Sequence, residues 1–545
     1  MTRFVKFRAL LPCNGWTLLH TLSCVCVLLP FAALIVGVMT PAGEYWSYIR
    51  EHMLPTYFFE TIALGAGSSI AALVLGVSLA WFVGIYDFWG KRVFEILLIL
   101  PLAIPPYIAA YAYDGFFGFT GSVQLFFNNL FDIRIHQIFP TLPAMFWAIW
   151  IFSITLFPYV YLLTRTFMRH QSGSLFENAL LLGGRRRLFW SVALPLLMPS
   201  AVSGAILVCL EVLNDFGVVS YYGLNTFTTA IFLSWFGMGD ADTGIKLAFI
   251  LLVMVLLVLL LRKSLQNVKR YRTVSTRESR FTPQKAVGFA RIGIPLFCIL
   301  VLCFSFLIPL AQMVLWLKMS YKSALNAALW EGIQYTLWVA LTATFIIMIA
   351  ATASVNANRL FGSKRRALAS EAATIGYGIP SAVLAIGVTL MFVNIDKLSA
   401  HLIPSLSMRE LSMGSAMLIF AYGVRFFAIG YQAAHMGFMR ISSVYTEASR
   451  TLGRTVTQTF FRVDLPLVKQ ALISGAALVF IDIVKELPLG LILRPFNSET
   501  LGTTVYRFAN NEVLEQTALP SLCIIGVSAI FIILTQQRRG ENGVS

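Results

Sequence analysis

The chain of 545 residues is 58% hydrophobic and 12% charged, carries a net charge of +16, and has a mean hydropathy of +0.77. Soluble domains carry about 25% charged residues, so a soluble fold of this composition would lack the polar surface to cover its core. The composition excludes an ordinary soluble protein and indicates one that exposes much of its surface to lipid.

Apolar runs of roughly 18 or more residues, long enough to cross a bilayer as helices, recur along the whole chain. Backbone groups in lipid must be hydrogen-bonded within their own segment, so these runs predict helices, whereas barrel strands would alternate weakly over about ten residues. We expect an all-α polytopic membrane protein with about twelve transmembrane helices. The approximate centres of these spans are Leu28, Ala71, Leu102, Phe152, Leu207, Met254, Cys303, Leu341, Val383, Phe420, Leu478 and Ile525.

Basic residues gather in alternate loops between the spans, and the intervening loops hold acids such as Glu44 and Asp240. The basic stretches are residues 3–8, 91–92, 165–187, 262–291, 359–366, 440–469 and 538–539. This alternation follows the positive-inside rule, so the excess charge indicates topology and not a nucleic-acid partner. We expect a multi-pass protein of the bacterial inner membrane, in contact with the lipid bilayer, with both termini in the cytoplasm.

The sequence contains no G-x-x-x-x-G-K-[ST] motif, so it lacks the phosphate-binding loop of an ATPase. Its six histidines show no metal-ligand spacing, and its seven cysteines include no CxxC pair. We expect that the chain binds no cofactor, is not an enzyme, and has no firm metal site.

The chain is an internal duplication with an offset of about 270–275 residues. This offset places Thr61 on Thr336, Ile104 and Pro105 on Ile379 and Pro380, and Asp215 on Glu486. Each half has an even number of spans, so both insert the same way up and should be related by a pseudo-two-fold axis along the membrane normal. We predict a first six-helix repeat at residues 1–262, a cytoplasmic linker at 263–291 and a second six-helix repeat at 292–545.

Both halves carry a polar stretch in the basic loop between their fourth and fifth spans. We call these stretches the first Glu loop (residues 174–195) and the second Glu loop (residues 443–466). In the second loop Val444, Ala448 and Leu452 recur every four residues and form a narrow apolar stripe on a short helix. A helix lying on lipid is one interpretation of such a stripe.

The repeated spacing from glutamate to glycine in both Glu loops favours a shaped protein partner. Each short helix is expected to stop in a left-handed turn at glycine, at Gly183 in the first loop and Gly453 in the second. In the first loop Ser174 and Glu177 also fit a capping box at the start of the helix.

The Glu loops resemble the cytoplasmic EAA loop of ABC importer permeases. The matching residues are Glu177, Ala179 and Gly183 in the first loop and Glu447, Ala448 and Gly453 in the second, while Asn178 and Ser449 replace alanines. The resemblance implies that each loop is a coupling helix seated in a groove of a separate ATPase subunit. It also implies two copies of that ABC ATPase subunit, which would bind ATP and Mg²⁺, and a periplasmic substrate-binding protein.

Further stretches are similar to the ferric-iron and thiamine branch of these permeases, in which two repeats are fused. Residues 485–488, 493–496 and 499–501 resemble its KELP, LRPF and ETL segments, and residues 215–217 and 225–229 resemble its DFG and NTFTT segments. The resemblance implies the type I ABC importer permease fold. It makes ferric iron the leading substrate and thiamine or its phosphate the alternative.

Ionisable side chains inside spans are functional candidates, because each costs about 2.5–3.5 kcal/mol to insert. The fifth span of each half carries two acids four residues apart, Glu211 with Asp215 and Asp482 with Glu486, and Lys485 lies beside the second pair. Glycines and prolines interrupt both spans close to these acids, a pattern that points to a substrate path.

Fe(III) favours anionic oxygen ligands, so Asp215 and Glu486 are candidate transient contacts, to which Tyr221 and Tyr222 could add phenolic oxygens. The alternative is a structural or gating role for these charges, with Lys485 paired to the acid three residues before it.

The sequence therefore predicts the membrane-spanning permease subunit of an ATP-driven importer, which transmits force and forms the path. An ion-coupled secondary transporter with parallel repeats is the rival hypothesis, and it would need deep protonatable groups and no ATPase partner. A membrane-embedded enzyme finds no support in the residue pattern.

Overall fold

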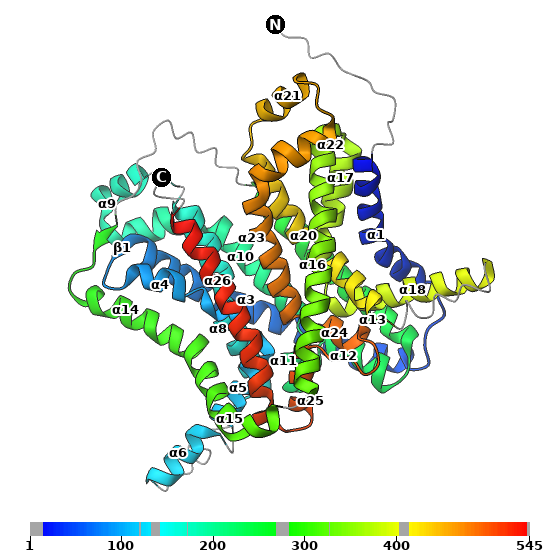
Figure 1. Cartoon of the computed structure of the whole chain (residues 1–545). Helices are drawn as coiled ribbons and strands as arrows, with labels where there is room; N and C mark the ends of the chain where they lie inside the picture. The colour runs from blue at the N-terminus through cyan, green and yellow to red at the C-terminus, as the bar shows by residue number, and fades with distance from the viewer. Residues whose placement is uncertain are drawn as a thin grey trace. The chain divides into compact units, whose positions relative to one another are not determined.

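The computed structural model describes residues 15–118, 121–131, 142–169, 171, 173–268, 283–325, 327–402 and 414–541. Within these residues the chain is almost entirely helical (Figure 1). Eleven helices there are long and apolar enough to cross a membrane, and a twelfth span results if the bent pair Lys91–Ala103 and Pro106–Leu130 counts as one. All the predicted span centres fall inside these segments, which confirms the all-α polytopic fold.

The chain folds into two compact units, and each unit draws on separate parts of the sequence. Unit 1 comprises Met1–Leu34, Leu337–Tyr377 and Gly387–Ile483, and unit 2 comprises Ile35–Thr336, Gly378–Ile386 and Val484–Ser545. The units therefore cut across the two sequence repeats, whose boundaries remain a prediction from the sequence.

Unit 2 contains most of the first half and the end of the second. Up to α10 its elements are α2 (Trp46–Tyr48), η1 (Ile49–Met53), α3 (Leu54–Ile85), β1 (Tyr86–Asp87), α4 (Lys91–Leu97), η2 (Leu100–Ala103), α5 (Pro106–Phe117), α6 (Ser122–Phe131), α8 (Ala144–Arg169), α9 (Gly173–Arg187), η3 (Leu188–Ala193) and α10 (Leu194–Asn214). They continue with α11 (Gly217–Tyr221), α12 (Phe227–Phe232), η4 (Leu233–Gly237), α13 (Ala241–Val268), β2 (Gln284–Lys285), α14 (Phe289–Leu302), η5 (Cys303–Leu307), α15 (Ile308–Ala324), α24 (Pro488–Leu493), α25 (Leu501–Asn510), η8 (Leu514–Thr517) and α26 (Ala518–Glu541).

Unit 1 contains the central helices of the second half, and four long helices run from one unit into the other. The elements of unit 1 are α17 (Lys364–Ala373), η6 (Thr374–Gly378), α20 (Ser415–Met439), α21 (Ser443–Thr451), α22 (Val456–Thr459) and η7 (Phe460–Asp464). The four long helices are α1 (Gly15–Val38), α16 (Ala327–Phe361), α18 (Ser381–Leu402) and α23 (Leu465–Lys485).

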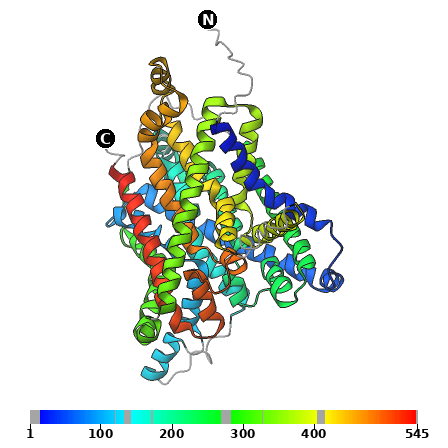
Figure 2. The same cartoon turned by 45° about the vertical axis from the view of Figure 1, so that its right-hand side comes forward.

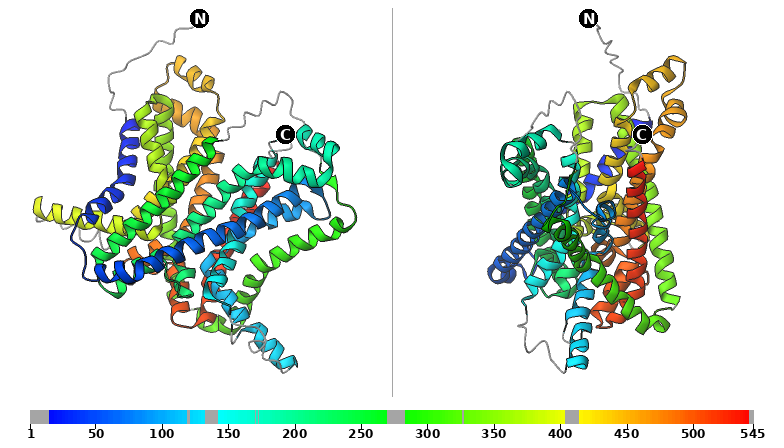
Figure 3. Two further views of the ribbon diagram at one scale, coloured as in Figure 1. Left: turned by 180° about the vertical axis from the view of Figure 1, so that it is seen from behind. Right: turned by 90° about the vertical axis from the view of Figure 1, so that its left-hand side faces the viewer.

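Helices α3, α8 and α10 form the packed centre of unit 2 and lie side by side in Figure 3. Glycines bring their backbones together. A Cβ added at Gly76 of α3 would lie 2.6 Å from Val160 Cβ in α8, and one added at Gly204 of α10 would lie 2.7 Å from Val160 Cα. Lipid tails are as apolar as the side chains, so the hydrophobic effect does not drive helices together within a membrane. Close packing of small residues provides the attraction instead.

The corresponding helices of the second half, α16, α20 and α23, pack in the same way in unit 1 (Figure 2). A Cβ added at Gly430 of α20 would lie 2.9 Å from Ile347 Cγ2 in α16, and one added at Gly437 would lie 2.8 Å from Ala471 Cβ in α23. Each repeat therefore contributes one glycine-packed group of three helices.

The first helices of the two halves exchange partners. In unit 1, Trp16 of α1 packs against Phe460 with ring centroids 4.6 Å apart. In unit 2, the segment formed by α14, η5 and α15 accepts a hydrogen bond from Tyr113 Oη to the carbonyl of Phe304 at 2.7 Å. The first helix of the first half thus packs in unit 1, which holds α16, α20 and α23 of the second half. The first helical segment of the second half packs in unit 2, which holds α3, α8 and α10 of the first half.

The parallel pair β1–β2 attaches the linker to the first half, with Tyr86 beside Gln284 and Asp87 beside Lys285. Residues 284–285 of the predicted linker therefore lie against the segment that follows α3.

A pair of hydrogen bonds repeats across the two halves at the positions that the duplication aligns. Thr61 Oγ1 accepts from the backbone N–H of Phe227 at 3.1 Å, and Thr336 Oγ1 accepts from the backbone N–H of Leu501 at 2.8 Å. Phe227 and Leu501 each begin a short helix with a threonine capping box, at Thr226 and Thr500 respectively. The duplicated sequence therefore builds the same joint twice.

We expect Thr336→Val to lower the stability of the chain by about 1–3 kcal/mol, because the buried N–H of Leu501 would lose its acceptor. Thermal unfolding of the purified full chain in detergent measures the change. Thr344→Val is the matched control, since the Thr344 hydroxyl is also buried but has no hydrogen-bond partner in the described part of the chain. Equal destabilisation by both variants would contradict the role given to the hydrogen bond.

Candidate functional site: coupling loops and helix breaks

The helix of the second Glu loop, α21, projects beyond the end of α23 in unit 1 (Figures 1 and 2). Ser442 caps it by accepting a hydrogen bond from the backbone N–H of Val444 at 3.4 Å. The helix ends at Thr451, and Gly453 follows with a φ of 83°. The prediction of a left-handed glycine at Gly453 is confirmed.

The helix of the first Glu loop, α9, is broken at Gly184, where φ is 66°. The left-handed turn predicted at Gly183 falls on a residue outside those that the structure describes in full. The neighbouring Gly184 takes the left-handed conformation, which a glycine adopts without a steric penalty. The capping box predicted at Ser174 lies outside the side chains that the structure describes.

The predicted contact residues of both Glu loops lie mostly on the surface. Glu177, Glu447 and Ala448 are exposed, and Ala179 is half-buried. The apolar stripe of α21 is open as well, with Val444 62% and Leu452 83% exposed. The stripe is thus left largely uncovered by the described residues, as the docking face of a helix would be.

The opposite face of α21 is tied to its own unit by buried polar groups. Thr446 Oγ1 donates a hydrogen bond to Asp464 Oδ1 at 2.9 Å, and the other carboxylate oxygen of Asp464 pairs with Arg359 of α16. Ser449 and Thr459 hydroxyls are 3.1 Å apart and form a second tie. Asp464 is 1% exposed, so water cannot replace these partners if they are removed.

The first Glu loop is held by apolar packing at the corresponding positions. Phe176 precedes Glu177 as Thr446 precedes Glu447, and Phe176 is completely buried in a cluster with Trp81 of α3 and Ala193 of η3. The two loops are therefore anchored by different chemistry, through side-chain packing in the first half and through an ion pair and hydrogen bonds in the second.

An acid stands at each predicted helix break. Helix α10 ends at Asn214, and Asp215 Oδ1 accepts a hydrogen bond from the backbone N–H of Val218 at 2.7 Å, at the start of α11. Helix α23 ends at Lys485, and Glu486 Oε1 accepts from the backbone N–H of Leu489 at 3.4 Å in α24. Both acids, which the duplication aligns, satisfy an N–H group that the broken helix leaves without an intrahelical acceptor.

The start of α18 connects the two breaks within unit 2. Ser381 Oγ donates to Glu486 Oε1 at 2.5 Å, and the backbone N–H of Ser381 donates to Asn214 Oδ1 at 2.7 Å. Glu486 is 7% exposed. The breaks are thus joined by hydrogen bonds.

The remaining predicted residues are dispersed over four places. Tyr221 Oη donates to Asp114 Oδ2 at 2.8 Å, and the ring of Tyr222 packs on that of Tyr221. Lys485 Nζ donates to the carbonyl of Leu102 at 3.4 Å. Glu211 lies in α10 within unit 2, whereas Asp482 lies in the part of α23 that belongs to unit 1.

Sequence analysis missed three residues of α5 that lie at this site, namely Tyr107, Tyr111 and Asp114. Tyr107 interacts electrostatically with both Asp215 and Glu486. The signal was present in PYIAAYAYDG, where spacings of four and three residues place these side chains on one helical face.

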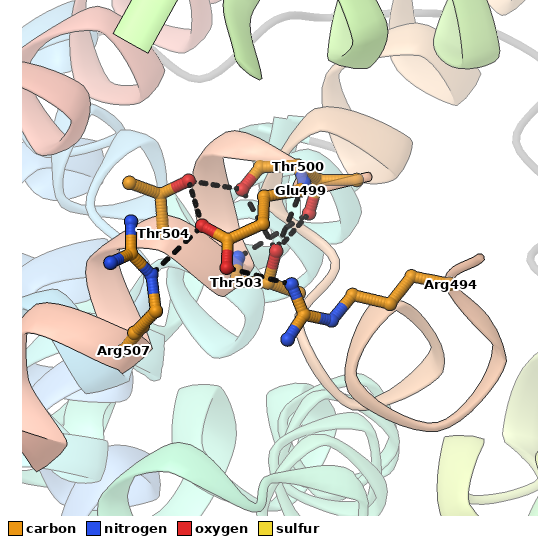
Figure 4. Close-up of polar contacts among 6 residues, drawn as sticks. All are labelled: Arg494, Glu499, Thr500, Thr503, Thr504 and Arg507. Atoms are coloured by element: carbon orange, nitrogen blue, oxygen red, sulfur yellow. Dashed lines mark hydrogen bonds and ion pairs between the residues drawn. The ribbon is translucent and has the colours of Figure 1, made fainter. Parts of the chain in front are cut away.

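Beyond the second break, Glu499 holds the segment between α24 and α25 (Figure 4). Its carboxylate pairs with Arg494 Nη1 at 2.9 Å and with Arg507 Nε at 3.0 Å. Burial alone would favour the neutral acid, but the hydrogen bonds and charges of both arginines outweigh burial and lower the pKa of Glu499. The ionised carboxylate restrains this segment, at whose tip Phe496 is 93% exposed.

Paired repeats, interrupted helices and exposed loop helices define a multi-pass membrane transport protein. A profile of the family described as binding-protein-dependent transport system inner membrane component matches residues 72–270 and 343–537. The chain belongs to this family, and it is a fused two-repeat ABC importer permease.

Relatives with known transport roles differ in how much of the chain they cover. The Fe(3+)-transport system permease protein FbpB 2 of Haemophilus influenzae is 22% identical over 88% of this chain and 89% of its own length. The sulfate transport system permease protein CysT of Salmonella typhimurium is 26% identical over 41% of this chain and 79% of its own length. The molybdenum transport system permease protein ModB of Escherichia coli is 26% identical over 38% of this chain and 91% of its own length.

We expect Asp464→Ala to destabilise the chain by about 3–5 kcal/mol, because Arg359 would keep its charge without its partner. The double variant Asp464→Leu with Arg359→Met removes both charges and should recover most of that loss. Thermal unfolding of the full chain in detergent checks both. A double variant less stable than the single one would contradict the proposed pairing.

Proposed function

We propose that this chain is the membrane-spanning subunit of an ATP-driven importer of ferric iron. A periplasmic binding protein delivers the iron. Two copies of a separate ATPase subunit dock on the two Glu loops and supply the motion. Both termini face the cytoplasm, as the alternation of basic loops supports.

The pair of acids at the helix breaks is the main reason for choosing a cationic substrate. Asp215 is half-buried and Glu486 is buried, and both lie where the interrupted helices of the two repeats approach each other in unit 2. Carboxylates suit a hard cation such as Fe(III). The same charges would repel sulfate or molybdate, so they argue against the substrates named for the shorter relatives.

The extent of the similarity to the transport relatives also supports ferric iron as the substrate. The iron permease relative spans nearly the whole chain with both repeats, while the sulfate and molybdenum permease relatives each span about one repeat. Thiamine is also a cation, and the acids alone do not discriminate against it.

Exposure of the α21 stripe supports the Glu loops as docking points. The polar face of α21 is hydrogen-bonded to its own unit, and its apolar face is exposed. Insertion of such an apolar face into a groove of a partner is a recurring mode of helix recognition. The ion pair between Asp464 and Arg359 would then pass the movement of the helix to α16.

Uptake of radioactive iron tests the substrate. Cells without a ferric importer of their own, supplied with this chain and its cognate ATPase and binding protein, should accumulate iron but neither sulfate nor molybdate. An ATPase variant unable to hydrolyse ATP should abolish the uptake. Uptake that follows the proton gradient and ignores ATP depletion would overturn the proposal in favour of a secondary transporter, and accumulation of thiamine alone would overturn the assignment of iron.

Copurification tests the docking surface. Val444→Asp places a charge in the apolar stripe of α21, so we expect the ATPase no longer to copurify with the chain, which should still insert and fold. Val287→Asp is the matched control, because Val287 lies in the linker and is also 62% exposed. Retention of the ATPase by the Val444 variant would contradict docking on this stripe.

A further inference from the structure

Helix α5 carries a row of oxygen-bearing side chains that no part of the coupling mechanism uses. Tyr107 and Tyr111 have ring centroids 6.1 Å apart, and Tyr111 packs edge-on to Tyr221 at 4.8 Å. Tyr221 Oη in turn donates to the exposed carboxylate of Asp114. The row runs from an exposed acid to a buried phenol.

Its inner end, Tyr107, is enclosed between the two helix breaks. A Cβ added at Gly217, just after the first break, would overlap the Cβ of Tyr107. One added at Gly502 of α25 would lie 3.3 Å from Tyr107 Oη. The same added Cβ would lie 3.2 Å from the backbone carbonyl oxygen of Glu486, so the hydroxyl of Tyr107 lies near the second break. Asp215 and Glu486 both contribute to the electrostatic environment of Tyr107.

The hydroxyls of Tyr107 and Tyr111 are buried and have no hydrogen-bond partner in the described part of the chain. An unsatisfied buried hydroxyl costs about 1–3 kcal/mol, and Tyr107 lies between the two helix breaks that carry Asp215 and Glu486. A bound group that takes up the oxygen of Tyr107 together with a free lone pair of each carboxylate would relieve this penalty. A hard, highly charged cation does so, because phenolate and carboxylate oxygens are the ligands it prefers.

We propose that Tyr107, Asp215 and Glu486 form a transient site for a hard trivalent cation, reached from Asp114 along Tyr221 and Tyr111. The site rests on the proposed function and specifies where iron touches the permease. On binding, the phenol O–H bond of Tyr107 breaks and its oxygen forms a bond to the metal ion. The ligand that had accompanied the ion is displaced from it and takes up the released proton. No electron is transferred in this step.

Visible spectroscopy tests the site directly, because Fe(III) bound to a phenolate gives a charge-transfer band in the visible range. We expect the band when ferric nitrilotriacetate is added to the purified full chain, and its loss in Tyr107→Phe. Tyr161→Phe is the matched control, since Tyr161 is equally buried in α8 and its hydroxyl also has no partner among the described residues. That variant should keep the band. A wild-type chain without the band, or a band that survives Tyr107→Phe, overturns the site.

Uptake measured on the same variants separates this inference from the proposed function. Loss of the ligand should reduce iron uptake by about tenfold or more in Tyr107→Phe, since even outer-shell changes at metal sites cost about 10–100-fold. Tyr161→Phe should transport normally. Normal iron uptake by Tyr107→Phe overturns the site and leaves an iron importer, whereas a wild-type chain that moves no iron overturns the proposed function itself.

Discussion

A helix that stops inside a membrane protein must find acceptors for the N–H groups of the segment that follows, in surroundings where water is scarce. At both breaks of this chain a carboxylate supplies that acceptor, from Asp215 to Val218 and from Glu486 to Leu489. The arrangement of α11 and α24 depends on these two hydrogen bonds. Because the acceptors are carboxylates and not hydroxyls, the same groups that shape the breaks also place negative charge between them.

A structural and a functional interpretation of these acids are therefore compatible. One oxygen of Asp215 and one of Glu486 are committed to backbone N–H groups, and Ser381 adds a second donor to Glu486. A carboxylate has about four lone-pair sites, so capping alone does not exhaust its capacity to accept. A cation that binds there would meet oxygens already held in position, which lowers the entropy lost on binding.

Sequence patterns predicted the features of this molecule that depend on local chemistry. Hydropathy located every span centre, and the internal offset pairs Thr61 with Thr336, which accept matching hydrogen bonds in the structure. The pairing of Arg359 with Asp464 could not be predicted in this way, because the two residues lie 105 positions apart and no local periodicity relates them. The left-handed conformation of Gly184 also escaped prediction, since two adjacent glycines are sterically equivalent for the turn.

Some positions carry equivalent groups in both repeats and serve the fold, whereas other positions differ between the repeats and are candidates for a specialised function. The threonine joints are the same in both halves, and a carboxylate caps each break although one is an aspartate and the other a glutamate, as expected for groups that satisfy backbone atoms. The anchors of the Glu loops differ, with Phe176 in one half and Thr446 in the other, and the offset that aligns Pro105 with Pro380 places Tyr107 opposite Ala382. A fused chain allows such divergence, because each half is present once and only its own partners constrain it. A single phenol beside two duplicated acids is an asymmetry that a permease built from two identical copies could not have.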